Sequence, residues 1–219
     1  MRLAVLASGR GSNLRAMLEA GRNGRLASRV VGVFSDRPAA GALSVAREFG
    51  VPAHVTRPGD FSARAAFDEA LFSAVAAIQP DLIVCAGYMR LISNRAVRRF
   101  QGKIINIHPS LLPAYPGLDT HSRVLAAGDA ETGASVHVVT PELDGGPVLA
   151  QSRVPVHAGD DAAALAQRVL GVEHELLVQV VAAIESGDLD PSMQNPRWRG
   201  LPLAAPLRAG AAGNLEIAA

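Results

Sequence analysis

Short apolar runs rich in β-branched residues alternate with longer helical stretches from the first residue to about Val139. The predicted strands are Leu3 to Ala7, Val30 to Phe34, Ala53 to Thr56, Leu82 to Ala86, Ile104 to His108 and Ala134 to Val139. The predicted helices are Asn13 to Ala20, Ala42 to Phe49, Ser62 to Ile78, Asn94 to Phe100 and Ser122 to Ala127. This alternation predicts a single-domain α/β fold, with a mostly parallel twisted sheet and helices on both faces.

Two more elements and a tail complete the pattern. Val148 to Val156 predicts a further strand, and Asp160 or Asp161 is a suitable N-cap for a long helix reaching about Glu185. Residues 188–219 combine four prolines with several Gly and Ala, which predicts irregular structure and a frayed end. We therefore expect a catalytic domain over residues 1–187 and an irregular tail over residues 188–219.

Composition fits this fold and limits the partners. Hydrophobic residues make up 49% of the chain and aromatic residues only 4%, so the core must consist largely of Val, Leu, Ile and Ala. That mixture suits parallel strands covered by helices. Lys plus Arg number 21 against 20 for Asp plus Glu, so no global field favours nucleic acid or a membrane. We expect small-molecule substrates, with any anion held by a local site, and the sequence leaves the oligomeric state open.

The single cysteine and the start of the chain indicate the compartment. Cys85 excludes an intrachain disulfide, and its apolar neighbours predict an inert core thiol. The apolar stretch near the first residue is too short for a signal peptide, and no run approaches the roughly 20 apolar residues of a membrane span. We expect a soluble cytoplasmic protein.

The segment Ser8 to Asn13 is a candidate phosphate site, because flexible glycines and hydroxyls precede a predicted helix. Exposed N–H groups and the helix dipole favour an anion there. A dinucleotide site is an alternative, since Asp36 ends the next strand as a ribose-binding carboxylate would, but Leu14 occupies the third small position of that motif. An ordinary turn or N-cap is the third interpretation.

Candidate catalytic residues follow the fifth strand. Asn106 and His108 are two residues apart, so they point to the same face near the carboxyl end of the strand, where open α/β sheets bind their ligands. The following prolines stiffen the loop. Asp144 lies in a later Asp-Gly-Gly segment, and a carboxylate beside a histidine favours the imidazolium. Taken alone, a histidine in a strand is more often structural, and turn chemistry also explains Asp-Gly-Gly.

The histidines predict no metal site, because none of them shows the short paired spacing of zinc ligands. They stand at positions 54, 108, 121, 137, 157 and 174. His121 and His137 could lie near the site, but the sequence assigns them no role.

Four segments together resemble the glycinamide ribonucleotide formyltransferases. They are SGRGSNL at 8–14, AGYMRLI at 86–92, INIHPSLLPAYPG at 105–117 and ELDGGPV at 142–148. The similarity runs in order from Met1 to about Glu185. It implies a formyltransferase fold with a Rossmann-like N-terminal half. It also implies transfer of the formyl group of 10-formyltetrahydrofolate to the amine of glycinamide ribonucleotide in de novo purine biosynthesis, without a metal.

The resemblance also implies roles for individual residues. Amine attack would be direct, with the oxyanion stabilised by Asn106 and His108 and assisted by Asp144. The implied substrate-binding residues are Gly11, Ser12, Asn13 and Glu173. The implied residues for the folate co-substrate are Arg64, Met89, Arg90, Leu91, Ile92, Asn106, Thr140, Pro141, Glu142, Leu143 and Asp144. Arg64 could instead be a solvated helix charge and Met89 a core residue. Ser135 stands where relatives commonly carry Thr.

Three rival functions remain. A formyltetrahydrofolate hydrolase shares the catalytic residues but would normally be longer at the N-terminus. A tRNA formyltransferase would need a further domain with a basic patch for RNA. A non-enzymatic nucleotide-binding module would bind its nucleotide whether or not His108 is present.

Overall fold

The computed structural model describes residues 1–192, 194–210 and 213–217. The chain forms two compact units, Met1–Asn106 and Ile107–Ala219. Strand β5 (Ile104–His108) passes from the first unit into the second.

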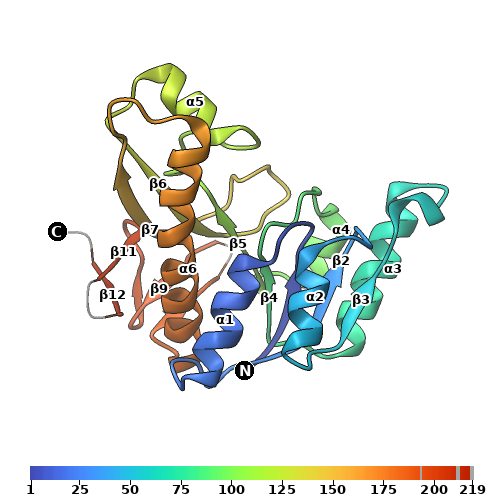
Figure 1. Ribbon diagram of the computed structural model, residues 1–219. Helices are drawn as coiled ribbons and strands as arrows, with labels where there is room; N and C mark the ends of the chain where they lie inside the picture. Colours follow the sequence, from blue (N-terminus) through green and yellow to red (C-terminus); the bar gives the residue numbers. More distant parts are fainter. Residues whose placement is uncertain (193, 211–212, 218–219) are drawn as a thin grey trace. The chain divides into compact units, whose positions relative to one another are not determined.

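The first unit is built on a parallel sheet (Figure 1). Its strands, apart from β5, are β1 (Arg2–Leu6), β2 (Arg29–Ser35), β3 (Ala53–Val55) and β4 (Leu82–Cys85). Within this unit the strand order is β5, β4, β1, β2, β3, and every pair is parallel. The carboxyl ends of these strands therefore lie at one edge of the sheet, where their loops can contribute to a common site.

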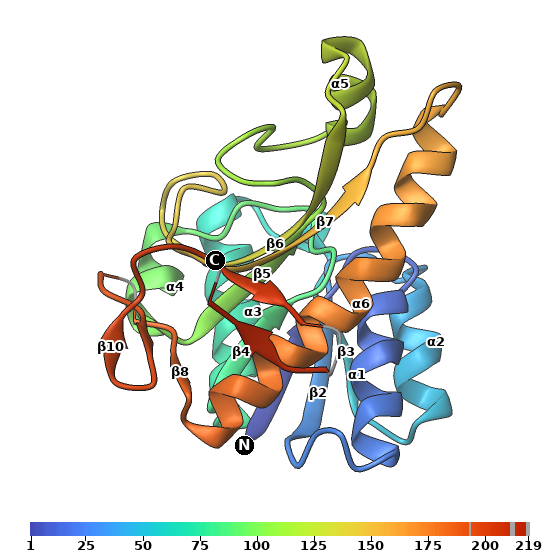
Figure 2. The ribbon, with the colours of Figure 1, turned by 90° about the vertical axis from the view of Figure 1, so that its left-hand side faces the viewer.

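Helices cover both faces of this sheet (Figures 1 and 2). One face carries α1 (Ser12–Arg22) and α2 (Gly41–Glu48), and the other carries α3 (Arg64–Ala77) and α4 (Asn94–Arg99). A short 3-10 helix, Pro58–Asp60, precedes α3. The predicted α/β class, with a mostly parallel sheet and helices on both faces, is confirmed.

The core of the first unit is apolar and closely follows the predicted strands. Phe34, Phe67 and Phe72 are its largest fully buried side chains. Cys85 is 3% exposed, and burial raises the pKa of its thiol to about 12. Since a thiol reacts as its thiolate, the prediction of an inert core cysteine is confirmed.

The second unit combines an antiparallel strand pair with a long helix. Strands β6 (Glu131–Val138) and β7 (Val148–Pro155) pair antiparallel, and α6 (Ala162–Ser186) packs against both. Helix α5 (Thr120–Ala127) precedes β6. The N-cap of α6 is Asp161, whose carboxylate accepts the Ala164 N–H at 2.7 Å.

The described part of residues 188–219 contains five short strands separated by irregular segments, so it is more ordered than the sequence pattern predicted. A three-stranded sheet contains β8 (Leu189–Asp190), β9 (Arg197–Trp198) and β10 (Leu201–Pro202). Strand β11 (Leu207–Ala209) pairs parallel with β7, and β12 (Leu215–Glu216) pairs antiparallel with β11.

Buried apolar side chains explain why these short strands form. Leu189, Trp198, Leu207 and Leu215 are each at most 8% exposed. Their burial offsets the entropy of ordering a Pro- and Gly-rich segment. Residues 193, 211, 212, 218 and 219 of the predicted tail lie outside the described residues. The predicted domain boundary after residue 187 stays a prediction.

Among the described residues, no helix combines the length and apolar character that crossing a membrane requires.

Replacing Leu207 by Ala tests whether residues after 187 contribute to the fold. Leu207 is fully buried, so we expect a loss of about 2–5 kcal/mol in the free energy of unfolding, measured with urea. The matched control is Leu201→Ala, because Leu201 is 71% exposed and its loss should change stability by no more than about 0.5 kcal/mol. Equal effects of the two substitutions would contradict an ordered tail.

Candidate active site

The predicted phosphate loop lies between β1 and α1 in the first unit. Gly11 is the N-cap of α1 and has φ +84°, a conformation that favours glycine. A Cβ on Gly11 would lie 2.6 Å from the Cα of Ala42, so the loop packs directly on α2. Ser12 and Asn13 form the first turn of α1. A helix of this length leaves its first N–H groups without intrahelical acceptors, which suits an anion.

A buried network behind this loop weighs against the dinucleotide interpretation. Asp36 is 5% exposed, and its Oδ1 accepts the hydroxyl hydrogen of Ser8 at 2.6 Å. The Ser8 oxygen in turn accepts the Met89 N–H at 2.9 Å. Leu14 is fully buried. The carboxylate that would hold a ribose is therefore used to connect the ends of β2, β1 and β4.

The predicted folate segment Met89 to Ile92 connects β4 to α4. Met89 is 53% exposed and Leu91 is 50% exposed, so the interpretation of Met89 as a core residue is wrong. Arg64, the first residue of α3, donates from Nη2 to the Leu91 carbonyl oxygen at 2.6 Å. Arg64 is thus tied to this segment and is not only a solvated helix charge.

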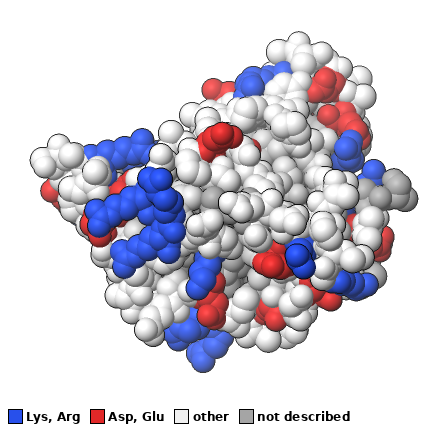
Figure 3. All heavy atoms as spheres, turned by 180° about the vertical axis from the view of Figure 1, so that it is seen from behind, with Lys and Arg blue, Asp and Glu red and all other residues white. Residues whose placement is uncertain are grey.

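Other arginines of the first unit lie on α4, which contacts α3. Helix α4 carries Arg95 and Arg99, which pair with Glu69 of α3 at 3.3 and 3.9 Å. Figure 3 shows a group of basic side chains on one part of the face, with acidic side chains beside it and with both kinds scattered over the rest of the face. With a single carboxylate between them, the arginines of α4 leave the local charge positive, which suits an anionic ligand.

The second unit places three of the candidate side chains together. The Nδ1 atom of His108 lies 3.5 Å from Oδ2 of Asp144, and Nε2 of His137 lies 3.5 Å from Oδ1 of the same carboxylate. Asp144 Oδ2 also accepts the Gly117 N–H at 2.8 Å. The Nε2 atom of His108 lies 3.0 Å from the carbonyl oxygen of Tyr115.

Burial determines the charge state of this group. Burial lowers the pKa of His108, although the Tyr115 carbonyl and the Asp144 carboxylate act to raise it. The expected effect of Asp144 is therefore present but outweighed by loss of solvent. Burial acts to raise the pKa of Asp144, but hydrogen bonds from His137 and Gly117 and the nearby histidines outweigh it, so the net pKa is lowered. Asp144 is thus a carboxylate at neutral pH.

His121 belongs to the same surroundings. Burial lowers its pKa, and the neighbouring His108 lowers it further. The sequence assigned no role to His121 or His137. The only available signal was their position close to the segments that carry His108 and Asp144.

Ser135 holds the loop that follows His108. Its hydroxyl donates to the Ser110 carbonyl oxygen at 2.7 Å and accepts the Leu112 N–H at 3.0 Å. Gln151 of β7 donates to the same hydroxyl at 2.9 Å. Sequence reasoning missed this network, because Ser110, Ser135 and Gln151 come from separate elements. The loop is fixed by hydrogen bonds as well as by its prolines.

The remaining predicted residues occupy varied positions. Thr140 is half-buried, and Pro141, Glu142 and Leu143 are exposed in the loop that ends at Asp144. Asn106 is half-buried on β5, two residues before His108. Glu173 is buried on α6, so its role rests on the resemblance. Within the described residues, no group of three or more His, Cys, Asp or Glu could hold a metal ion.

Ser8→Ala tests the buried network of the first unit. The substitution removes both hydrogen bonds of the hydroxyl and leaves the Asp36 carboxylate buried without its Ser8 donor. We expect a loss of about 1–3 kcal/mol in the free energy of unfolding. The control is Ser44→Ala, an exposed serine of α2, with an expected change within about 0.5 kcal/mol. Equal stability of wild type and Ser8→Ala would disprove the proposed importance of this network.

Asp144→Asn tests the electrostatics of the second unit. Asparagine keeps an oxygen for the Gly117 N–H but removes the charge that raises the pKa of His108. We therefore expect a lower His108 pKa in the variant, so that less imidazolium is present at any given pH. Titration of the imidazole C–H signals by NMR measures this, with exposed Asp190→Asn as control. An unchanged or higher His108 pKa in Asp144→Asn would refute the assignment.

Comparisons with known proteins agree with this geometry. The family model described as formyl transferase matches residues 1–181. The phosphoribosylglycinamide formyltransferase of Escherichia coli is 42% identical over 198 residues, which cover 90% of this chain and 93% of that protein. The Mycobacterium tuberculosis protein of the same name is 46% identical over 183 residues, 84% of each chain.

A solved structure agrees as well. The phosphoribosylglycinamide formyltransferase from Coxiella burnetii, in complex with CHES, superposes with a TM-score of 0.89 at 39% identity, covering 93% of this chain and 96% of that one. The family model, the sequence relatives and this solved structure all match most of the chain. The chain therefore belongs to the formyl transferase family.

Proposed function

We propose that this chain transfers the formyl group of 10-formyltetrahydrofolate to the amine of glycinamide ribonucleotide, giving formylglycinamide ribonucleotide and tetrahydrofolate in de novo purine biosynthesis. The observation that carries the proposal is the buried contact of His108 with the Asp144 carboxylate at 3.5 Å, with Asn106 two residues earlier on the same strand. The relatives that share the phosphoribosylglycinamide formyltransferase name support it.

The reaction needs no nucleophilic side chain. The substrate amine attacks the formyl carbon, a C–N bond forms, and the carbonyl electrons move to oxygen. A proton then passes from the attacking nitrogen to the folate nitrogen, and the bond from that nitrogen to the formyl carbon breaks. The Asn106 amide and the His108 imidazole would donate hydrogen bonds to the oxyanion, a role whose loss typically costs about 10²–10³ in rate. For His108 this requires the Nε2–H to leave the Tyr115 carbonyl oxygen, its partner at 3.0 Å in the free chain.

The electrostatics of His108 fit this role. In the free chain, burial lowers the pKa of His108, which favours the neutral imidazole. An oxyanion forming beside the ring would act in the same direction as Asp144 and raise that pKa. His108 would then donate most strongly when the charge develops, which stabilises the transition state more than the ground state.

Each unit contains its own set of residues proposed to bind the two substrates. In the first unit, Gly11, Ser12 and Asn13 would bind the phosphate or ribose of the nucleotide, and Met89 to Ile92 with Arg64 would bind the folate. The arginines of α4 suit the anionic tail of a folate. In the second unit, Glu173 would contact the ribose, and Thr140 to Asp144 would contact the pterin.

The proposal also covers which part of the chain is catalytic and where in the cell the protein acts. Residues 1–187 would carry the catalytic machinery, because every residue given a role lies within them. The protein would act in the cytoplasm on small molecules, without nucleic acid, membrane or metal.

The decisive experiment follows tetrahydrofolate release by absorbance, with purified protein, 10-formyltetrahydrofolate and glycinamide ribonucleotide. We expect release that requires the nucleotide and falls by at least about 10²–10³ in an Asn106→Ala/His108→Ala double variant. His157→Ala is the matched control, since His157 is exposed, and it should keep wild-type activity.

The other outcomes identify the rivals. Release without the nucleotide would indicate a formyltetrahydrofolate hydrolase. Nucleotide binding without release, equal in wild type and double variant, would indicate a binding module. A double variant as active as the wild type would remove Asn106 and His108 from the mechanism.

A further inference from the structure

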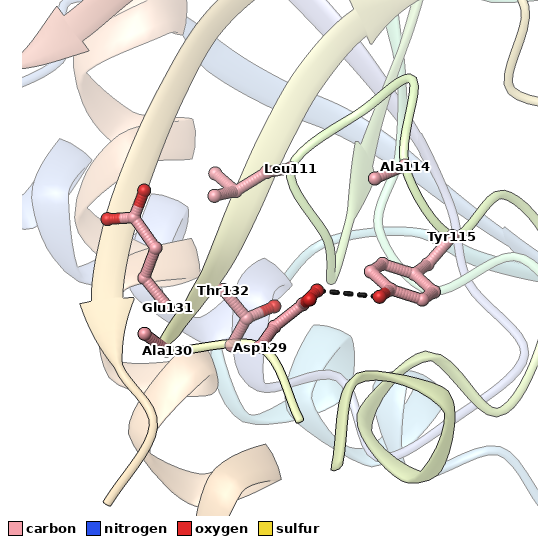
Figure 4. Close-up of a pocket in the computed structure, with 7 residues that line it drawn as sticks. All are labelled: Leu111, Ala114, Tyr115, Asp129, Ala130, Glu131 and Thr132. Atoms are coloured by element: carbon pink, nitrogen blue, oxygen red, sulfur yellow. Dashed lines mark hydrogen bonds between the residues drawn. The ribbon is translucent and has the colours of Figure 1, made fainter. Parts of the chain in front are cut away.

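The second unit contains a pocket that no role above uses (Figure 4). Its volume is about 250 Å³. The residues that line it are Leu111, Ala114, Tyr115, Asp129, Ala130, Glu131 and Thr132. In Figure 4, Leu111 and Ala114 lie on the opposite side of the group from Asp129 and Thr132. At about 30 Å³ per water in the liquid, the pocket has room for roughly eight waters, or one small organic molecule.

Thr132, at the second position of β6, supplies an unsatisfied polar group. The residue is only 2% exposed, and its hydroxyl oxygen has no hydrogen-bond partner within the described structure. Leaving a buried hydroxyl unpaired is unfavourable, and most buried polar side-chain atoms in proteins have a partner. This oxygen is almost closed to water, so a molecule bound in the pocket would satisfy it once the Thr132 side chain turns toward the pocket.

Tyr115 and Asp129 form the polar wall beside Thr132. The Tyr115 hydroxyl donates to Asp129 Oδ2 at 2.6 Å, so the tyrosine oxygen presents lone pairs, not a hydrogen, to a further group. The second carboxylate oxygen of Asp129 has capacity for additional donors. Arg123 lies 5.3 Å from the centre of the tyrosine ring but donates to the carbonyls of Pro116 and Leu118, not to Asp129.

The charge of the lining favours a cation. Two of the lining residues, Asp129 and Glu131, carry carboxylates, and none is basic. Arg153 pairs with Glu131, whereas Asp129 has no cationic partner within the described part of the chain. Oxygens of Asp129, Tyr115 and Thr132 all accept hydrogen bonds. A ligand with several donors and no acceptor matches them, and an ammonium group has three donors and no acceptor.

The apolar residues of the lining indicate which kind of molecule would bear the ammonium group. Leu111, Ala114 and Ala130 present only carbon atoms from their side chains. They would pack against a short aliphatic chain and remove it from water. We propose that this pocket binds a primary ammonium group on a short aliphatic chain, with the ammonium hydrogen-bonded to Asp129 and Thr132.

The pocket lies beside the segment that positions His108. Tyr115 contributes its hydroxyl to the pocket and its carbonyl oxygen to His108 Nε2, 3.0 Å away. The proposed ligand would therefore bind next to the catalytic loop, at a place that neither formyl-transfer substrate is proposed to occupy.

The test is an NMR titration of the full chain with butylammonium, using 1-butanol and butyrate as the neutral and anionic probes. We expect butylammonium to shift the amide signals of the pocket residues, and the two other probes to bind at least about tenfold more weakly. A hydrogen bond to a charged group contributes about 1.5–3 kcal/mol, and 1.4 kcal/mol corresponds to tenfold in affinity.

Variants separate the site from nonspecific binding. Thr132→Val and Asp129→Asn should each weaken butylammonium binding about tenfold or more, while Thr132→Ser keeps the hydroxyl and should bind as the wild type does. Asp190→Asn is the matched control, because Asp190 is an exposed carboxylate on β8. It should not change the affinity for butylammonium. Melting temperatures report whether each variant is folded.

Three results would overturn the proposal. The first is the absence of saturable shifts at the pocket residues, which would mean that the pocket holds water only. The second is an equal response to 1-butanol or butyrate. The third is unchanged binding in folded Thr132→Val and Asp129→Asn proteins.

Discussion

The candidate site in the second unit depends on one buried carboxylate. Asp144 accepts the Gly117 N–H from the loop after β5 and lies 3.5 Å from both His108 and His137. A buried carboxylate is costly unless its oxygens are hydrogen-bonded, so these partners have to stay in place together. One group thereby fixes the loop that follows β5, the loop that follows β6 and the orientation of the His108 ring. Ser135 reinforces the same loop through Ser110 and Leu112.

The same burial explains how His108 can respond to its substrate. Loss of solvent lowers the pKa of His108, while Asp144 and the Tyr115 carbonyl act against it. A histidine held between these opposing effects changes its charge when a third charge appears nearby. The formyl transfer that we propose creates such a charge, on the oxygen of the tetrahedral intermediate. The fold would therefore supply the response through the burial of His108 and its two partners.

In the first unit, a carboxylate that resembles a cofactor ligand has an internal function. Asp36 ends β2 where a dinucleotide-binding protein would hold its ribose, but its side chain accepts a hydrogen bond from Ser8, and Ser8 in turn holds Met89. The network joins three strand ends at the edge where parallel sheets bind ligands. For a carboxylate at the end of a strand in such a sheet, only the structure shows whether its hydrogen-bond partner is a ligand or another residue of the protein.

The sequence by itself determined the elements through α6, because hydrophobic periodicity is a local property of the chain. It also placed Asn106 and His108 on one face of β5 and offered Asp144 as a carboxylate for a nearby imidazole, and the resemblance implied the same three residues. Only the tertiary structure decided the rest. Strand β11 exists because it pairs with β7, and the low His108 pKa arises from burial by other elements. The partners of Asp36 and the unpaired Thr132 hydroxyl likewise depend on residues distant in sequence, which no local pattern encodes.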